Sequence, residues 1–324
     1  MIAARALLVA ALLAVCVIAG AGMFADFGKL QIAFEQFSLQ RIGMACTLVV
    51  GNSALRIVRF RYYLGRLEIT VSWTEAALVF IAGFLFTVTP GQKGEVVKGL
   101  ILKKRRGASA TVVASSVVAE RFTDVVGLLL VAALGVWQHG AYRELFWGVC
   151  GLCGLFLASV VHPRLVPSTV AWAERRLPHT KLVRVFASVT RAHEVLRKLC
   201  SVKSLAIGVS LAAAAWLLEA VAFRVLLDGL GAAGEFGPAV VVYAMATLFG
   251  AVSMLPGGVG STEAVMVALL ITPAFGFNLD RAGAVLATLL IRLCTLWFGV
   301  GLGALAWLLL FRGRLSVDSD KPTS

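Results

Sequence analysis

The stretch Leu255-Pro256-Gly257-Gly258-Val259-Gly260-Ser261-Thr262-Glu263 ends a hydrophobic run over residues 239–255 of this 324-residue chain. A second stretch of the same kind, Thr89-Pro90-Gly91-Gln92-Lys93-Gly94-Glu95, ends the hydrophobic run 73–88. A helix rarely continues through a Pro-Gly pair, because proline lacks the N–H group and glycine readily takes other backbone conformations. In a bilayer, a broken helix is tolerated only where protein or a water-filled cavity surrounds its free backbone groups. The two breaks therefore predict a binding site inside a membrane protein.

The composition supports the membrane interpretation. The chain is 60% hydrophobic and only 15% charged, and its mean hydropathy is +0.91. Further apolar runs have the length that a transmembrane helix needs. They cover residues 6–24, 41–58, 109–137, 145–161, 204–227 and 282–311. We therefore predict an all-α fold, a polytopic integral membrane helical bundle of about six full spans with two broken, re-entrant helix hairpins.

The net charge of +13 is explained by membrane topology. Basic residues gather at 56–66, 93–106 and 164–203, whereas the other loops are almost neutral. Loops rich in Lys and Arg stay on the cytoplasmic side, and this rule also places both termini in the cytoplasm. A nucleic-acid partner is not needed to explain the charge.

The same assignment of loops to the two sides of the membrane gives the two breaks opposite orientations. The first broken hairpin opens to the cytoplasm and the second opens to the other face of the membrane. Arg59 lies 31 residues before Pro90, and Arg224 lies 32 residues before Pro256. This pattern predicts an inverted-topology repeat, which is typical of transporters with a site near the bilayer midplane.

The predicted repeat divides the chain into a single transmembrane domain and a short tail. The domain covers residues 1–311, with repeat halves at about 40–137 and 204–311. A basic amphipathic connector over 163–203 is expected to lie on the inner leaflet, and residues 312–324 are a polar cytoplasmic tail.

Charged residues inside the apolar runs are the strongest candidates for the site. Glu120, Arg121 and Asp124 share one span and Arg292 lies in another. Ionisable groups at this depth cost several kcal/mol in lipid, so they face the bundle interior or a wet cavity. Two interpretations stay open: these groups pair with one another, Arg292 with Glu263 or Glu95, or the arginines bind an anion such as phosphate, which a guanidinium fits well.

The breaks offer complementary groups for an anion. Their glycines let backbone N–H groups approach a ligand, and a restarting helix presents free N–H groups at its positive end. Ser261 or Thr262 is a candidate N-cap, and Glu263 either caps the helix, orients Arg292 or carries a proton. The candidate substrate-binding residues are Arg121, Arg292, Glu120, Asp124, Pro90, Gly91, Gly94, Glu95, Pro256, Gly257, Gly258, Gly260, Ser261, Thr262 and Glu263.

No motif for catalysis, metal or cofactor binding accompanies these residues. Cys150 and Cys153 have the spacing of a metal pair but lack a second pair of ligands. We therefore expect no cofactor, no metal and no enzymatic activity.

Taken in order, these motifs resemble the lysylphosphatidylglycerol synthase transmembrane-region family, also called the flippase-like domain family. The resemblance rests on Pro90 to Lys98, Arg105-Arg106-Gly107, Glu120-Arg121-Phe122-Thr123-Asp124, Leu255 to Ala264, and Arg292 with Trp297. Gln92-Lys93 stands where this family has an arginine. The resemblance implies a bacterial or archaeal membrane protein linked to lipid movement. In two-part members an aminoacyl transferase follows the membrane region, whereas this chain ends at Ser324, so we expect a stand-alone member without synthase activity.

The function that follows is a flippase in the bacterial cytoplasmic membrane. It would move an anionic, phosphate-bearing lipid, either a phospholipid or a lipid-linked phosphate, through a central cavity between the repeats. Two alternatives stay open: a membrane-embedded lipid-modifying enzyme, and a non-transporting subunit that docks a partner through residues 164–203. A homodimer and a separate partner synthase also stay open.

Overall fold

The computed structural model describes residues 6–14, 20, 27–35, 37–89, 94–136, 143–176, 183–232 and 234–315. All regular structure within these ranges is helical, which confirms the all-α class. The elements in chain order are α2 (Phe27–Glu35), α3 (Leu39–Arg66), α4 (Trp73–Phe84), α5 (Gly94–Arg106), α6 (Ala110–Val136), α7 (Arg143–Val161), α8 (Leu165–Arg176), α9 (Val183–Leu199), α10 (Val202–Gly229), α11 (Phe236–Val252), η2 (Pro256–Gly258), α12 (Ser261–Leu270), η3 (Pro273–Phe275), α13 (Arg281–Arg292), η4 (Leu293–Trp297) and α14 (Phe298–Leu315).

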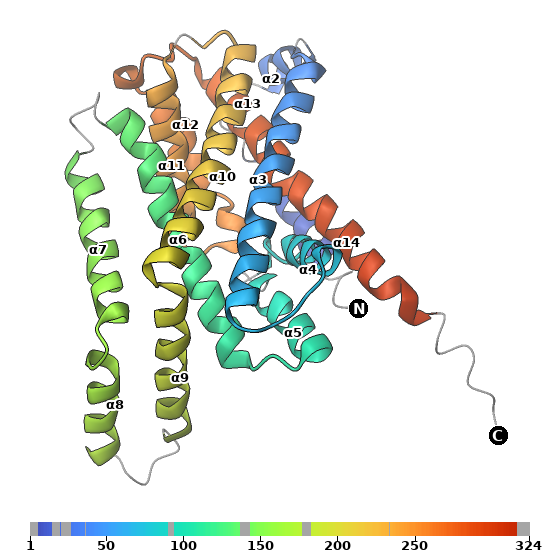
Figure 1. The fold of residues 1–324 in the computed structure, drawn as a ribbon. Coiled ribbons are helices and arrows are strands. Elements are labelled where there is room, and N and C mark those ends of the chain that lie inside the picture. Colours follow the sequence, from blue (N-terminus) through green and yellow to red (C-terminus); the bar gives the residue numbers. More distant parts are fainter. Residues whose placement is uncertain are drawn as a thin grey trace, which may run out of the picture.

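The long helices α3 and α10 form the centre of the bundle and run side by side in opposite directions (Figure 1). Each has 28 residues. Small residues allow the close approach: an added Cβ at Gly51 of α3 would lie 3.1 Å from a Leu218 methyl group of α10. The Asn52 side-chain amide crosses this interface and donates a 2.8 Å hydrogen bond to the carbonyl of Ala215. The two helices are therefore joined by both packing and a buried polar contact.

Two helix hairpins enter the bundle from opposite ends, α4 with α5 and α11 with α12 (Figure 1). In the first, Gly94 lies against the carbonyl of Gly83, where no side chain would fit. In the second, Gly250 and Gly258 leave room for the hydroxyl of Thr262. Glycine is therefore needed at these positions for close helix approach. Four predicted first-break residues, Pro90, Gly91, Gln92 and Lys93, lie outside the described part of the chain.

Within the described residues, three helical segments are long and apolar enough to cross a membrane: Leu39–Arg66, Val202–Gly229 and Arg281–Phe311. The pair Phe146–Val161 and Leu165–Arg176, bent by 69°, makes a fourth if it is counted as one span. Helix α6 is about 40 Å long at 1.5 Å per residue but carries three charges in its middle. The polytopic bundle is thus confirmed, while the total of about six spans stays a prediction.

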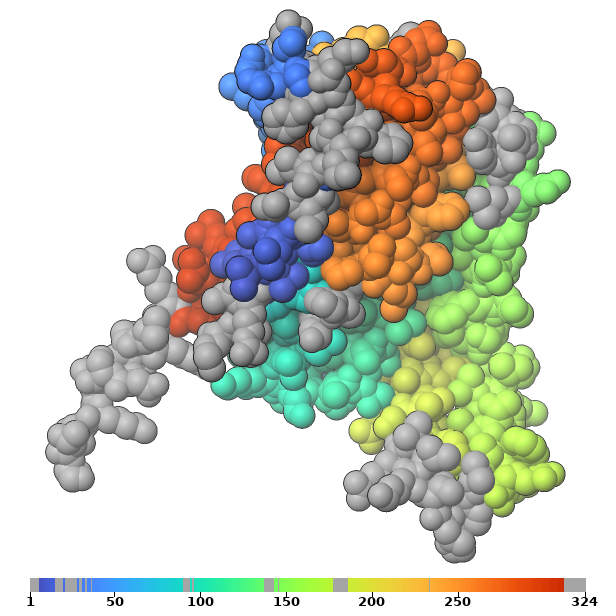
Figure 2. All heavy atoms as spheres, turned by 180° about the vertical axis from the view of Figure 1, so that it is seen from behind, coloured from blue at the N-terminus to red at the C-terminus, as the bar shows by residue number. Residues whose placement is uncertain are grey.

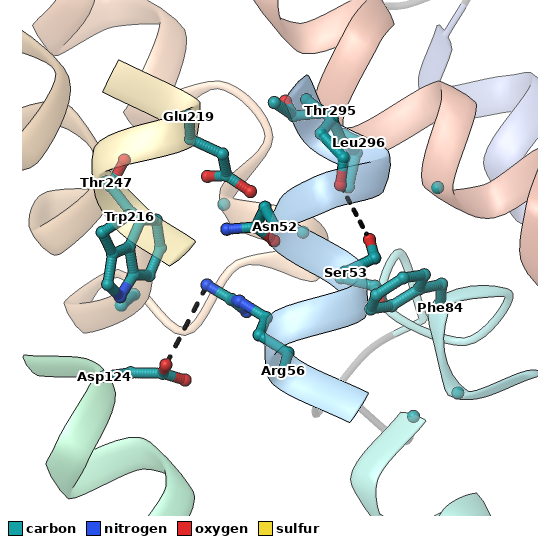
Figure 3. A pocket seen from close by; sticks show the side chains of 18 of the residues that line it. Asn52, Ser53, Arg56, Phe84, Asp124, Trp216, Glu219, Thr247, Thr295 and Leu296 are labelled. Atoms are coloured by element: carbon teal, nitrogen blue, oxygen red, sulfur yellow. Dashed lines mark hydrogen bonds and ion pairs between the residues drawn. The ribbon is translucent and has the colours of Figure 1, made fainter. Parts of the chain in front are cut away.

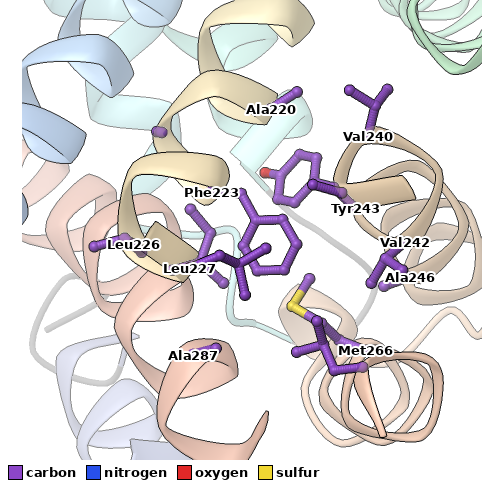
Figure 4. Close-up of a cluster of buried hydrophobic side chains, with 14 of the residues drawn as sticks. Ala220, Phe223, Leu226, Leu227, Val240, Val242, Tyr243, Ala246, Met266 and Ala287 are labelled. Atoms are coloured by element: carbon purple, nitrogen blue, oxygen red, sulfur yellow. The ribbon is translucent and has the colours of Figure 1, made fainter. Parts of the chain in front are cut away.

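The largest apolar core lies where α10, α11, α12 and α13 meet (Figure 4). Phe223 and Leu227 of α10 pack with Met266 of α12, and all three side chains are almost fully buried. On the opposite face, the helical residues 6–14 lie beside α14 (Figure 2). Their Ala6 and Ala10 join a cluster that holds the end of α4 and the start of α14. Both helix hairpins are therefore fixed by apolar contacts.

The basic connector over residues 163–203 is helical in its described parts. It forms two helices, α8 and α9, which run side by side below the bundle (Figure 1). The C-terminal end of α9 packs against protein: Leu199 clusters with Tyr63 and Ala119, joined by Val195 and Leu196. This apolar contact with α3 and α6 explains why α9 stands against the bundle.

The packing of α14 on α4 gives a test of the fold. An alanine Cβ at Gly303 would meet the backbone of α4, 3.0 Å from Leu85 Cα, whereas a Cβ at Gly301 has nothing within 4 Å. We expect Gly303→Ala to lower the melting temperature in detergent, at a cost of about 1–3 kcal/mol for overpacking. Gly301→Ala on the same helix should leave it unchanged. Equal melting temperatures of the two variants would contradict this packing.

Candidate functional site

A cavity of about 260 Å³ lies between the two hairpins and the central helices (Figure 3). Pockets for drug-sized molecules have about 300–1,000 Å³, so this cavity suits a small polar head group. Its wall mixes apolar residues with an excess of basic side chains. The charged residues that line it are Arg56, Arg59, Lys98, Arg121 and Arg292, against Glu120, Asp124 and Glu219.

Two of the basic side chains come from a stretch that the charge pattern assigned to a cytoplasmic loop. That prediction is wrong, because α3 continues to Arg66 and carries Arg56 and Arg59 into the bundle. The Arg59 side chain is only 2% exposed. A guanidinium tolerates this depth because a carboxylate lies opposite: Arg59 Nη2 is 2.8 Å from Asp124 Oδ1. Its Nη1 also donates a 3.2 Å hydrogen bond to the Thr123 hydroxyl.

Lys98 is a third basic residue that the charge pattern counted among the loop charges. It was assigned to the basic cytoplasmic stretch, but it lies on α5 with only 3% of its surface exposed. Its ammonium donates a 3.2 Å hydrogen bond to Glu120 Oε2 of α6. It also lies 4.6 Å from the centre of the Phe80 ring and 5.2 Å from that of Phe60. The carboxylate and the ring faces both stabilise the buried ammonium.

Arg56 is held more loosely than Arg59. Its guanidinium stacks 4.5 Å from the centre of the Trp216 ring, and its nearest carboxylate oxygen, Asp124 Oδ1, is 4.0 Å away (Figure 3). Within the part of the chain that the structure describes, Arg56 makes no hydrogen bond, and its buried Nε has no partner. The buried indole N–H of Trp216 likewise has no acceptor there. These groups leave N–H donors for a ligand in the cavity.

The second break is built around Arg292. Its Nε donates a 2.7 Å hydrogen bond to Glu263 Oε1, and its Nη2 donates a 2.6 Å bond to the carbonyl of Gly257. The other oxygen of Glu263 accepts a 2.7 Å bond from the N–H of Gly260. Glu263 therefore both caps α12 and orients Arg292. Glu263 is one of the two partners of Arg292 that the sequence proposed.

The backbone of this break explains its glycines. Gly257, Gly258 and Gly260 all have positive φ angles, of 62°, 64° and 90°, which residues with a Cβ rarely adopt. The N–H of Gly258 donates to the carbonyl of Leu255, and that of Val259 donates to Pro256. These two donors and the N–H of Gly260 are therefore used inside the break, and the ligand-facing donors come mainly from side chains.

Directly after Arg292, the helix widens into the π-helical segment η4. Here Thr295 and Leu296 line the cavity, together with Phe298 and Gly299 at the start of α14. Such widenings often occur at functional sites, and this one was not predicted.

Arg121 occupies a different position from the other predicted residues of α6. Glu120 and Asp124 are 4% and 6% exposed, whereas the Arg121 side chain is 52% exposed. Its Nη1 lies 3.9 Å from Asp124 Oδ2. Arg121 thus lies at the mouth of the cavity. The deep position that the sequence suggested for Arg121 is occupied by Arg59.

Fourteen of the fifteen predicted site residues divide into three groups. Those that line the cavity are Gly94, Glu120, Arg121, Asp124, Gly257, Gly258, Thr262 and Arg292. Pro256, Gly260, Ser261 and Glu263 form the supporting break without lining the cavity, while Pro90 and Gly91 lie outside the described residues. Glu95 lies on the first turn of α5. The structure adds residues that sequence analysis missed, namely Asn52, Ser53, Arg56, Arg59, Lys98, Trp216, Glu219 and Tyr243.

Glu219 and Tyr243 form a buried pair between α10 and α11. The Tyr243 hydroxyl donates a 2.6 Å hydrogen bond to Glu219 Oε2. The Glu219 side chain reaches the cavity from the side opposite Phe84 (Figure 3). A single glutamate in the apolar run 204–227 was the sequence signal that could have identified it.

Outside the cavity, ion pairs join the ends of helices. Lys198 of α9 donates a 2.9 Å hydrogen bond to Glu68, which follows α3, and this contact lowers the pKa of the Glu68 carboxyl. Among the described residues, no group of three His, Cys, Asp or Glu side chains is placed to hold a metal ion.

Comparison with known proteins identifies the family. The sequence profile of the lysylphosphatidylglycerol synthase TM region matches residues 7–303. The chain belongs to this family. Members similar to it include a UPF0104 membrane protein of Methanothermobacter thermautotrophicus, 26% identical over 279 residues, which cover 82% of this chain and 81% of the relative. A UPF0104 membrane protein of Pyrococcus horikoshii is 23% identical over 314 residues, 88% of this chain and 90% of the relative.

The lysylphosphatidylglycerol synthase TM-region match spans both hairpins and every residue that lines the cavity. The chain is therefore a multi-pass membrane protein of this family, as its sequence motifs predicted. The names of the relatives specify a membrane protein and no activity, so the function has to be argued from the cavity.

Proposed function

We propose that the chain is a flippase that moves an anionic, phosphate-bearing lipid across the cytoplasmic membrane. The observation that supports this most directly is the charge of the cavity, with five basic side chains against three acidic ones inside an apolar bundle. Because an uncompensated charge in a bilayer costs several kcal/mol, such an excess of positive charge favours an anionic ligand. In this proposal the chain transports the lipid and does not change it chemically.

The arrangement of the cavity suits a phosphate group. Arg56 and Arg292 approach from α3 and α13, on opposite repeat halves of the predicted fold. Each guanidinium presents N–H donors in a planar fork that matches phosphate oxygens. A lipid head group between them would replace its hydrogen bonds to water with hydrogen bonds to these donors, while the acyl chains of the lipid stay in the bilayer.

The two hairpins suggest how each side of the membrane gains access. They enter from opposite ends and both border the cavity (Figure 1), as an inverted repeat requires. Movement of one hairpin relative to the central helices would open the cavity to one leaflet. In this proposal both termini are cytoplasmic, which keeps the basic connector on the cytoplasmic side.

Vesicles that contain the purified full-length chain and a fluorescent phosphatidylglycerol test the proposal. A membrane-impermeant quencher then reports how fast lipid leaves the inner leaflet. We expect Arg56→Ala to slow this movement roughly tenfold, which corresponds to losing about 1.4 kcal/mol of head-group binding. Arg61→Ala is the matched control, because Arg61 lies on the same helix over the Trp73 ring and does not line the cavity.

Three outcomes separate the candidate functions. Lipid movement equal to that of protein-free vesicles would reject the flippase. A new lipid product in mass spectrometry would instead support a membrane-embedded enzyme. Loss of a co-purifying partner on neutralising Arg175 and Arg176 of α8, with no lipid movement by the native chain, would support a docking subunit.

A further inference from the structure

Glu219 differs from the other carboxylates of the bundle interior in its partners. Glu120 pairs with Lys98, Asp124 pairs with Arg59, and Glu263 pairs with Arg292, each at 3.2 Å or less. Glu219 forms no ion pair within the described residues, and its one hydrogen bond there comes from Tyr243. Its charge is therefore the least compensated of the four.

The surroundings of Glu219 make its protonation state important. The residue is 9% exposed and reaches the cavity from α10. The ionisable groups that face it are Arg56 from α3, Asp124 from α6, Tyr243 from α11 and Arg292 from α13. Arg56 and Arg292 attract a negative carboxylate, whereas Asp124 repels it. Because both arginines also face the cavity, Glu219 competes with any anion that enters for the same positive charge.

This competition links proton binding to anion binding. An ionised Glu219 repels a phosphate between Arg56 and Arg292, and a protonated Glu219 does not. Protonation therefore raises the affinity for the anion. By thermodynamic linkage, a bound anion raises the affinity of Glu219 for a proton by the same factor.

We propose that Glu219 is a proton-binding site that loads one proton together with the anionic head group. The inference rests on the proposed function and adds its energy source. A proton and a head group with one negative charge cross together without net charge, so the movement is driven by a pH gradient and is insensitive to membrane voltage. On release the proton leaves Glu219 with the lipid, and the side chain returns to its ionised form.

Proton uptake on lipid binding tests this directly and does not require transport. Short-chain phosphatidylglycerol is added to the full chain in detergent with weak buffer, and a pH-indicator dye reports protons removed from solution across a series of starting pH values. For the native chain we expect uptake of up to about one proton per bound lipid, as one linked site requires. Glu219→Gln, which keeps the size of the side chain, should lose this uptake.

Two further variants serve as controls. Glu68→Gln removes an exposed carboxyl outside the cavity and should leave the uptake unchanged. Tyr243→Phe keeps the carboxyl of Glu219 but removes its hydrogen-bond donor. Because that donor stabilises the ionised form, the uptake should persist and move to higher pH. Size-exclusion chromatography checks that each variant is folded.

The outcomes separate this inference from the proposed function. Lipid binding without proton uptake at any pH would overturn the coupling and leave the flippase proposal intact. Uptake that persists in Glu219→Gln, or that disappears in Tyr243→Phe, would also overturn the assignment to Glu219. If the native chain binds no phosphatidylglycerol at all, both the anion site and the coupling are rejected.

Discussion

Replacing Arg59 by alanine is expected to destabilise the protein by about 3–5 kcal/mol, the usual cost of removing one partner of a buried ion pair. Asp124, only 6% exposed, would keep its charge without its closest partner. Arg56 at 4.0 Å and Arg121 at 3.9 Å are more distant substitutes. We expect Arg59→Ala to be recovered at much lower yield and to lose its monodisperse peak at a lower temperature.

Two comparisons show whether the buried charge is the cause. Arg61→Ala on the same helix removes a guanidinium that lies 4.2 Å from the centre of the Trp73 ring and should cost about 0.5–1 kcal/mol. The double variant Arg59→Met with Asp124→Leu removes both charges and should regain most of the stability. If Arg59→Ala is no less stable than Arg61→Ala, the Arg59–Asp124 pair does not hold α3 and α6 together.

Features that depend on local chemistry could be predicted from the sequence. A Pro-Gly pair breaks a helix wherever it occurs, and Gly257 and Gly258 adopt the conformations that this break requires. A charge in the middle of an apolar run has to be buried against protein or polar space, and Glu120, Asp124 and Arg292 line the cavity. These predictions needed no knowledge of how the helices pack.

Features that depend on contacts between residues far apart in the sequence could not be predicted. Arg56 and Arg59 stand at the end of an apolar run, where a loop and a helix look alike in sequence. Only the packing of α3 on α6 brings Asp124 to Arg59 and makes burial possible. In the same way, Lys98 can be buried because Glu120 and two aromatic rings meet it from other helices. The positive-inside rule counts such residues as loop charges, although their partners hold them inside the bundle.

Replacing Arg292 by alanine is expected to have the largest effect on lipid movement. Arg292 lines the cavity while its Nε and Nη2 are fixed by Glu263 and Gly257, so its remaining N–H groups are held in one orientation. A hydrogen bond to a charged group contributes about 1.5–3 kcal/mol, and losing about 2.7 kcal/mol slows movement roughly 100-fold. The vesicle assay with fluorescent phosphatidylglycerol measures this rate. Arg281→Ala, at the exposed start of the same helix, should keep the native rate.

A double variant separates the two roles that Arg292 offers, neutralising Glu263 and binding the head group. If Arg292 only neutralises Glu263, then removing both charges in Arg292→Ala with Glu263→Gln restores lipid movement. The glutamine oxygen still accepts the hydrogen bond from Gly260 that caps α12, so the break keeps its shape. If Arg292 binds the phosphate, the double variant stays as slow as Arg292→Ala, because no guanidinium faces the cavity from α13. We expect the second result, and a native rate in the double variant would reject Arg292 as the head-group ligand.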